Sequence, residues 1–223
     1  MGPPVGSDGP WEPGRAIVEN PVMRIHLRRP LSVLSATAIV LTMFAIVPPV
    51  ATAGLCGEFR WPIKSLSDPN RRDIDFHARR TTLARLYNRE APDRVRERTP
   101  RIAPQEFHVY KVVARLVKAE IEGDSDVKFV ISVPGFPEQT MAVEFLGPPC
   151  MTSRFHRHRM LAARHKALEM CGPLSEEYTQ LRGRVQLRGV GFWGNRRHEE
   201  IGGAPNHFEL IPVLGIRGTC EQV

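Results

Sequence analysis

Five segments of the chain alternate apolar and polar residues with the period of two that is typical of β-strands with one buried face. They span residues 106–122, 127–133, 140–146, 183–193 and 208–216. Turn-forming Gly, Asp, Ser and Pro residues separate the first three segments, and a Gly/Pro/Asn-rich loop joins the last two. We expect the last two segments to form the long strand pair onto which the rest of the protein folds.

One segment between the third and fourth predicted strands has helical spacing instead. Residues 155–171 place Met160, Ala163, Ala167, Met170 and Cys171 on one helical face. The predicted order is therefore three strands, one helix and two strands, which is the order of the five-stranded OB barrel. We predict a mainly β (α+β) fold in which residues 105–223 form an OB-like β-barrel.

The first part of the chain has the features of export. Residues 1–22 are rich in Gly and Pro, and they predict a disordered extension or a misassigned start, with Met23 as the alternative initiator. Residues 23–53 contain a basic start, an apolar run and an Ala-Thr-Ala site, which together predict a secretory signal peptide. We expect cleavage after Ala53, no membrane span in the mature chain, and a secreted, periplasmic or cell-envelope protein. An uncleaved membrane anchor is the alternative.

Residues 54–104 show little regular patterning, and they predict an irregular N-terminal segment and linker that wraps the barrel. A short helix is expected near residues 81–88, where Leu83, Leu86 and Tyr87 can face inward. The Pro- and Arg-rich run that follows predicts an extended surface linker.

All four cysteines follow the predicted cleavage site, and an even number in an exported chain favours disulfide bonds. Four cysteines allow three pairings, and the sequence does not choose among them. Our preferred pairing joins Cys150 to Cys171 around the helix and Cys56 to Cys220 at the two ends. We predict no metal, because no CxxC or HxxxH spacing of the kind found in zinc sites occurs.

The chain has a formal net charge of +7, and arginine supplies most of the excess. Such a balance can indicate affinity for nucleic acid, acidic glycan or a membrane surface. The arginines are spread along the sequence, which favours a general compositional bias over a local binding surface.

Several short strings resemble a family of secreted bacterial proteins of uncharacterised function, whose signature is GVGFFD, HG, GxAPN and ELHPV. This chain has GVGF at residues 189–192, APN at 204–206 and ELIPVL at 209–214. The resemblance extends to WPIKSLSD at residues 61–68 and covers most of the mature chain, but it implies no particular reaction.

The departures from this signature bear on function. Gly194 stands where the family has an acid, Ile211 and Lys128 stand where histidines are usual, and His198 matches the loop histidine only with one inserted residue. If the acid and histidines of the family form a site, the resemblance implies that this chain lacks it.

OB barrels commonly bind extended polymers through stacked aromatics and a basic groove. Trp193, Arg115, Lys128 and Asn206 are therefore the candidate ligand-binding residues. We expect Trp193 to be exposed where its strand gives way to a loop, whereas Phe129 shares the face of core residues.

A secreted metal-dependent, nuclease-like hydrolase is one alternative, and it needs acids that converge on a metal. The weak catalytic candidates are Asp124, Asp126, Glu144, His198 and Glu209. The two aspartates also suit a tight turn, and a buried Glu209 could satisfy loop amides.

The sequence thus predicts an exported, disulfide-containing binding or structural module of unknown ligand, monomeric, without cofactor and without assigned catalysis. A binder of single-stranded nucleic acid or acidic glycan is the other alternative, with an anionic polymer as the partner.

Overall fold

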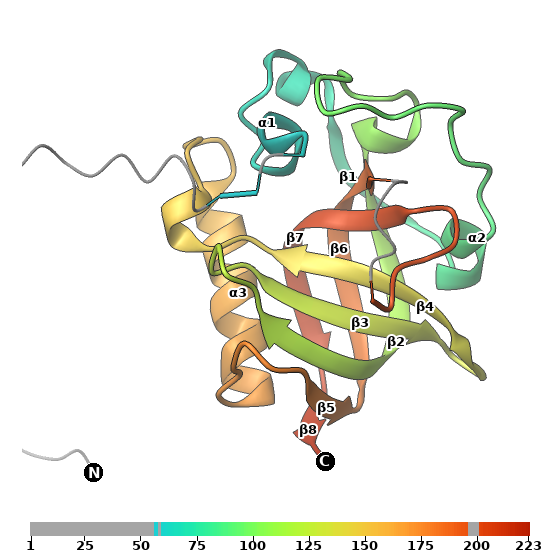
Figure 1. The fold of residues 1–223 in the computed structure, drawn as a ribbon, viewed down its shortest axis with the longest axis vertical. Coiled ribbons are helices and arrows are strands. Elements are labelled where there is room, and N and C mark those ends of the chain that lie inside the picture. Colours follow the sequence, from blue (N-terminus) through green and yellow to red (C-terminus); the bar gives the residue numbers. More distant parts are fainter. Residues whose placement is uncertain (1–55, 58, 196–200) are drawn as a thin grey trace, which may run out of the picture. The chain divides into compact units, whose positions relative to one another are not determined.

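The computed structural model describes residues 56–57, 59–195 and 201–223, which belong to a compact unit that spans Pro48–Val223. This part of the chain forms eight strands, three α-helices and three 3-10 turns (Figure 1). The strands are β1 Asp75–Arg80, β2 His108–Ile121, β3 Val127–Val133, β4 Phe136–Phe145, β5 Thr179–Arg182, β6 Arg184–Trp193, β7 Phe208–Gly218 and β8 Glu221–Gln222. The helices are α1 Trp61–Lys64, α2 Leu83–Tyr87 and α3 Arg157–Cys171, and the 3-10 turns are η1 Pro69–Asp73, η2 Gln105–Phe107 and η3 Pro148–Cys150.

The five predicted strands and the predicted helix all form, close to their expected bounds. Strand β2 pairs antiparallel with β3 and β6, β3 pairs with β4, and β6 pairs with β7. Strand β4 meets β7 in parallel through one registered pair, Val143 with Leu210. The predicted number of strands is wrong, because β1, β5 and β8 extend the sheet, and the sheet is not a clean barrel.

The longest strand, β2, shows why alternation predicted the sheet well. Val112, Ala114 and Leu116 are buried, whereas Arg115 between them is exposed. The inward phase changes after Leu116, and the register with β3 shifts between Leu116 and Lys118. A bulge at this point bends the strand so that its two halves pair with different neighbours.

The core lies between the inward faces of the strands and the helices that cover them. Helix α3 packs against β4 and β7 (Figure 1), burying Ala163 and Ala167 in the larger of two apolar clusters and Met160 in the smaller. Helix α2 adds Leu83 and Leu86, each at most 1% exposed. Each such side chain contributes roughly 1.5–3 kcal/mol through burial.

The segment before β2 is more regular than predicted. It contains α1, β1 and α2, and β1 runs parallel to β2 as part of the sheet. The expected helix near residues 81–88 is confirmed as α2, whose N-terminus is capped by the Thr82 hydroxyl, 3.2 Å from the Arg85 amide. The first part of this segment is therefore regular and joins the sheet, whereas residues 91–104 contain no helix or strand, as predicted for the linker.

One buried ion pair helps to fasten this segment to the sheet. Arg60 is 1% exposed, and both of its terminal nitrogens lie 2.6 Å from the carboxylate of Glu106, which is 0% exposed. The same carboxylate accepts hydrogen bonds from the backbone amides of Trp193 and Ile102. Such complete pairing is what makes a buried charge tolerable.

The preferred disulfide pairing is wrong. The bonds join Cys56 to Cys150 and Cys171 to Cys220, with Cα–Cα distances of 5.5 and 5.0 Å. Helix α3 accounts for this, because its 15 residues make it roughly 22 Å long, Cys171 is its last residue and Cys150 precedes its first turn. A disulfide requires Cα atoms within about 7 Å.

The predicted extension and secretory signal, residues 1–22 and 23–53, lie outside the described residues. Among the residues that the structure does describe, no helix is both long enough and apolar enough to cross a membrane.

Candidate functional site

Three of the predicted catalytic candidates lie together where β3 begins and β4 ends. Asp124 and Asp126 occupy the β2–β3 turn, and Glu144 on β4 is opposite Lys128 on β3. Glu122 joins them from the end of β2, with its carboxylate 3.4 Å from the Lys128 ammonium. We call Glu122, Asp124, Asp126 and Glu144 the acid cluster.

Lysines neutralise part of this cluster. Nζ of Lys64 in α1 lies 2.9 Å from Oε2 of Glu144, which is 2% exposed, and Lys128 lies beside Glu122. A metal-dependent hydrolase needs several side-chain ligands directed at one point. In the described part of the chain, no group of three or more His, Cys, Asp or Glu side chains could hold a metal ion.

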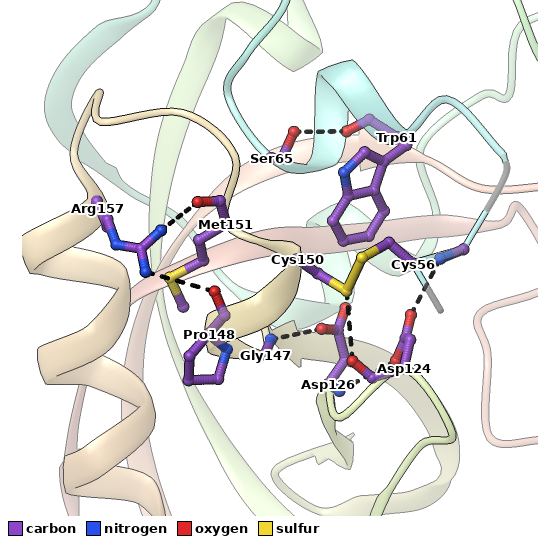
Figure 2. The surroundings of a disulfide bond; sticks show 11 residues. Cys56, Trp61, Ser65, Asp124, Asp126, Gly147, Pro148, Cys150, Met151 and Arg157 are labelled. Atoms are coloured by element: carbon purple, nitrogen blue, oxygen red, sulfur yellow. Dashed lines mark hydrogen bonds between the residues drawn. A yellow bond between two sulfur atoms is a disulfide. The ribbon is translucent and has the colours of Figure 1, made fainter. Parts of the chain in front are cut away.

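The acid cluster is also a fastening point for the chain, as Figure 2 shows. Asp126 Oδ1 accepts a hydrogen bond from the Gly147 amide at 2.5 Å, and Asp124 Oδ2 accepts one from the Gly57 amide at 3.3 Å. Asp124 Oδ1 also accepts from the Asp126 amide, which is the turn geometry expected of an aspartate. The neighbouring Cys56–Cys150 disulfide ties the same segments covalently.

Burial and like charge shift the ionisation of this cluster. Burial, followed by the charges of Glu144 and Asp124, raises the pKa of Asp126 to about 8, although the Gly147 amide opposes this. Burial and Glu144 raise the pKa of Glu122 to about 7, although Lys128 opposes this. Asp126 Oδ2 is buried and has no hydrogen-bond partner. At neutral pH the cluster therefore retains protons instead of presenting a full set of anionic ligands.

Trp193 is not the exposed platform that the sequence predicted, because it is only 2% exposed. It is the last residue of β6 and pairs with Phe208 on β7, and the two rings pack edge to face at 4.8 Å. Asn206 serves the scaffold, since its amide nitrogen donates to the carbonyls of Leu86 and Arg89, each at 2.9 Å. Its oxygen accepts from the Phe208 amide.

Two more of the predicted site residues, Lys128 and Glu209, are buried. Lys128 is 5% exposed, which does not suit a surface ligand contact. Glu209 is 4% exposed on β7, and its Oε1 lies only 2.1 Å from where a Cβ at Gly194 would lie, so its carboxylate is beside Gly194 just after β6. His198 lies outside the described residues. The five catalytic candidates are therefore not shown to converge.

Arg115 leads to a different surface. Its side chain lies on the outward face of β2, directly opposite Arg184 on β6, and four positions earlier Lys111 lies opposite Arg188. Outward residues alternate with buried Val185 and Leu187 on β6. Like charges directly opposite each other on a sheet are unfavourable, so two such pairs side by side are unusual.

The neighbouring strands extend this charge. Arg80 at the end of β1 is registered with Lys111, and Arg217 on β7 is registered with Gln186 on β6. Registered partners project to the same face of a sheet. We call this surface the basic face, and its cations are Arg80, Lys111, Arg115, Arg184, Arg188 and Arg217.

A groove of about 640 Å³ crosses the basic face. Its lining includes four of the six cations, and no acidic residue contributes to it. The lining residues are Arg80, Thr81, Thr82, Leu83, Ala84, Lys111, Val113, Val133, Pro134, Arg184, Gln186 and Arg217.

The cations of the basic face have no anionic partner among the residues that the structure describes. No ion pair in the described part of the chain includes any of the six. Desolvation, followed by the charges of Arg80, Arg217 and Arg188, lowers the pKa of Lys111. A bound anion would relieve this repulsion.

Sequence reasoning selected Arg115 but missed the other five cations. The signal was present, because residues 111–115 and 184–188 each begin and end with a cation on the outward phase of a strand. What the sequence lacked was the register that sets these strands side by side.

No protein-family model, curated protein or solved structure matches this chain. The resemblance to a secreted family therefore stays a prediction, and the case for function depends on the geometry of the described residues.

Proposed function

We propose that this protein is an exported binding module built on an OB-like barrel, and that an anionic polymer binds across the basic face. The observation that carries this proposal is the gathering of six cations on one face, without an ion pair to any described residue, where four of them line a groove that contains no acid. Catalysis has less support, because the acids are buried beside lysines and not arranged around a metal.

The strand pairing supports an OB-like arrangement. Strands β2, β3, β4, β7 and β6 each pair with two others of the same set, and α3 lies between β4 and β6 in sequence. That is the connectivity expected for a five-stranded OB barrel. Strands β1, β5 and β8 are additions to it.

Two disulfides support export, because such bonds form and persist in oxidising compartments. The resemblance to a secreted family and the signal-like sequence of residues 23–53 support the same proposal.

Binding to a polymer of fixed charges releases the polymer's condensed counterions, so affinity falls as salt rises. Each cation that contacts one charge contributes roughly one unit to the slope of log affinity against log salt. Arginine is well suited to this role, since its planar fork can bind two oxygens of a sulfate, phosphate or carboxylate group.

The test is binding of the oxidised full chain to dextran sulfate over a series of salt concentrations. The double variant Lys111→Glu/Arg188→Glu should weaken binding at least tenfold and lower the salt slope by about two. The matched control, Arg72→Glu/Arg159→Glu, makes the same change in net charge at exposed positions of η1 and α3. Equal losses in the two double variants, or binding indifferent to salt, would refute a specific basic face.

A further inference from the structure

We infer that the polymer bound at the basic face is an acidic polysaccharide and not a single-stranded nucleic acid. This inference rests on the proposed function, and it names the ligand class for the same groove. Three features carry it. The lining contains no aromatic residue, and the barrel aromatics Phe129, Phe192 and Trp193 are buried. Neutral polar and apolar groups also lie between the cations of the lining.

The groove offers no stacking platform. Proteins that bind single strands usually stack successive bases on aromatic side chains, and they add a basic groove for the phosphates. The lining of this groove contains cations, threonines, a glutamine, a proline and aliphatic residues, but no Phe, Tyr, Trp or His. It therefore supplies the charge component of nucleic-acid binding without the aromatic side chains on which bases usually stack, and only its arginines could take that place.

The aromatics that OB barrels could use for stacking are committed to the core. Phe129 and Phe192 are 0% exposed, and Trp193 is 2% exposed. Phe136 is the exposed exception, at 52%, on the hairpin between β3 and β4. Phe136 does not line the groove, but its registered partner Val133 does. Replacing Phe136 therefore tests whether an aromatic side chain beside the groove stacks bases.

The remaining lining suits a chain of sugar rings. Thr81, Thr82 and Gln186 place hydroxyl and amide groups among the cations, where they can exchange hydrogen bonds with sugar hydroxyls. Val113 and Pro134 add apolar surface on which the C–H face of a sugar ring can rest. An acidic polysaccharide presents anionic groups, hydroxyls and C–H surface along one chain, so it can use all three kinds of contact.

The test compares two probes that carry the same number of charges at the same salt concentration. One probe is a dextran sulfate oligosaccharide, and the other is an oligothymidylate single strand. The oxidised full chain should bind dextran sulfate at least tenfold more tightly than oligothymidylate, with similar salt slopes for both. Thr81→Val/Gln186→Leu should reduce the preference for dextran sulfate, because the polar contacts are lost while every cation remains.

The outcomes separate the two proposals. If oligothymidylate binds as tightly as dextran sulfate or more tightly, and Lys111→Glu/Arg188→Glu weakens it, the basic face binds polyanions but the polysaccharide assignment is wrong. A tenfold loss of oligothymidylate binding in Phe136→Ala would overturn the assignment in the same way, since it would reveal base stacking at the rim. If neither probe responds to Lys111→Glu/Arg188→Glu, the proposed function itself fails.

Discussion

The acid cluster and the basic face both bring like charges together, but the protein treats the two regions differently. In the acid cluster, Asp126 and Glu144 are 1% and 2% exposed, and lysines, backbone amides and retained protons balance the charge. On the basic face, Arg115, Arg184 and Arg188 are exposed and have no ion-pair partner in the described part of the chain. The acids are therefore neutralised within the fold, whereas the cations remain free for an external anion.

The difference follows from the cost of burial. An unpaired buried charge costs several kcal/mol, so a sequence that buries acids must supply partners or raise their pKa values. Exposed charges keep their water, and two like charges opposite each other on a sheet cost only a fraction of a kcal/mol. The basic face can therefore persist without partners at small expense in stability, which makes it the better candidate for a binding surface.

The largest expected effect comes from removing the covalent link beside the acid cluster. Cys56→Ser/Cys150→Ser opens a link across 94 positions of sequence, and it should lower the free energy of unfolding by about 2–5 kcal/mol. Chemical denaturation measures this loss. Binding of dextran sulfate below the unfolding transition should stay within about twofold of the unmodified chain. A parallel loss of binding would show that the two regions are coupled.

A smaller effect is expected from the protonation of Asp126. Because its pKa is raised to about 8 in the folded state, the folded protein binds more protons than the unfolded chain at pH values between about 4 and 8. Its contribution to stability is full below the unfolded pKa and is lost as the pH rises through about 8. Asp126→Asn should therefore reduce the loss of stability that occurs as the pH rises through about 8. It should raise the melting temperature at pH 8.5 by roughly 2–4 °C.

The control for this measurement is Asp73→Asn, an exposed aspartate in η1. It should leave the pH dependence of the melting temperature unchanged. If Asp126→Asn instead lowered stability at every pH, the ionised carboxylate would be the favoured form, and the account of the acid cluster given above would be wrong.

The smallest expected effect is a change in the protonation of Lys111. Its pKa is lowered in the free protein by desolvation and by neighbouring arginines. A bound polyanion should raise this pKa, so binding at about pH 9.5 should take up a fraction of a proton. Calorimetry in two buffers of different ionisation enthalpy measures that uptake. Lys111→Arg should abolish the uptake and retain binding, whereas Asp126→Asn should leave both unchanged.

Alternation along single strands was enough to predict most of the sheet. The bounds of β3 were predicted as residues 127–133 and are Val127–Val133, because every residue of that strand is buried and Gly/Asp and Gly/Pro turns flank it. The strand β1 was missed, because Asp75–Arg80 is a short, polar sequence at the margin of the sheet. It forms through pairing with β2, which its own pattern does not reveal.

The failures in the site have the same physical origin. Trp193 was predicted to be exposed from its position at a strand end, but its burial depends on Phe208 and on the segment that carries Glu106. The disulfide pairing likewise depends on the contacts that bring Cys56 next to Cys150 and Cys171 next to Cys220. Each of these is a contact between distant parts of the sequence, and a local pattern contains no information about it.

The parallel pairing of β1 with β2 also has a practical consequence for shortening the protein. A fragment cut at residue 105, where the sequence pattern predicts that the barrel begins, would lose Arg80, Thr81 and Thr82, which line the groove. It would also uncover backbone groups of β2 that now pair with β1, and an open strand edge is a template for self-association. Such a fragment would aggregate more readily and would lack part of the groove, so the segment before β2 both protects a strand edge and completes the lining of the groove.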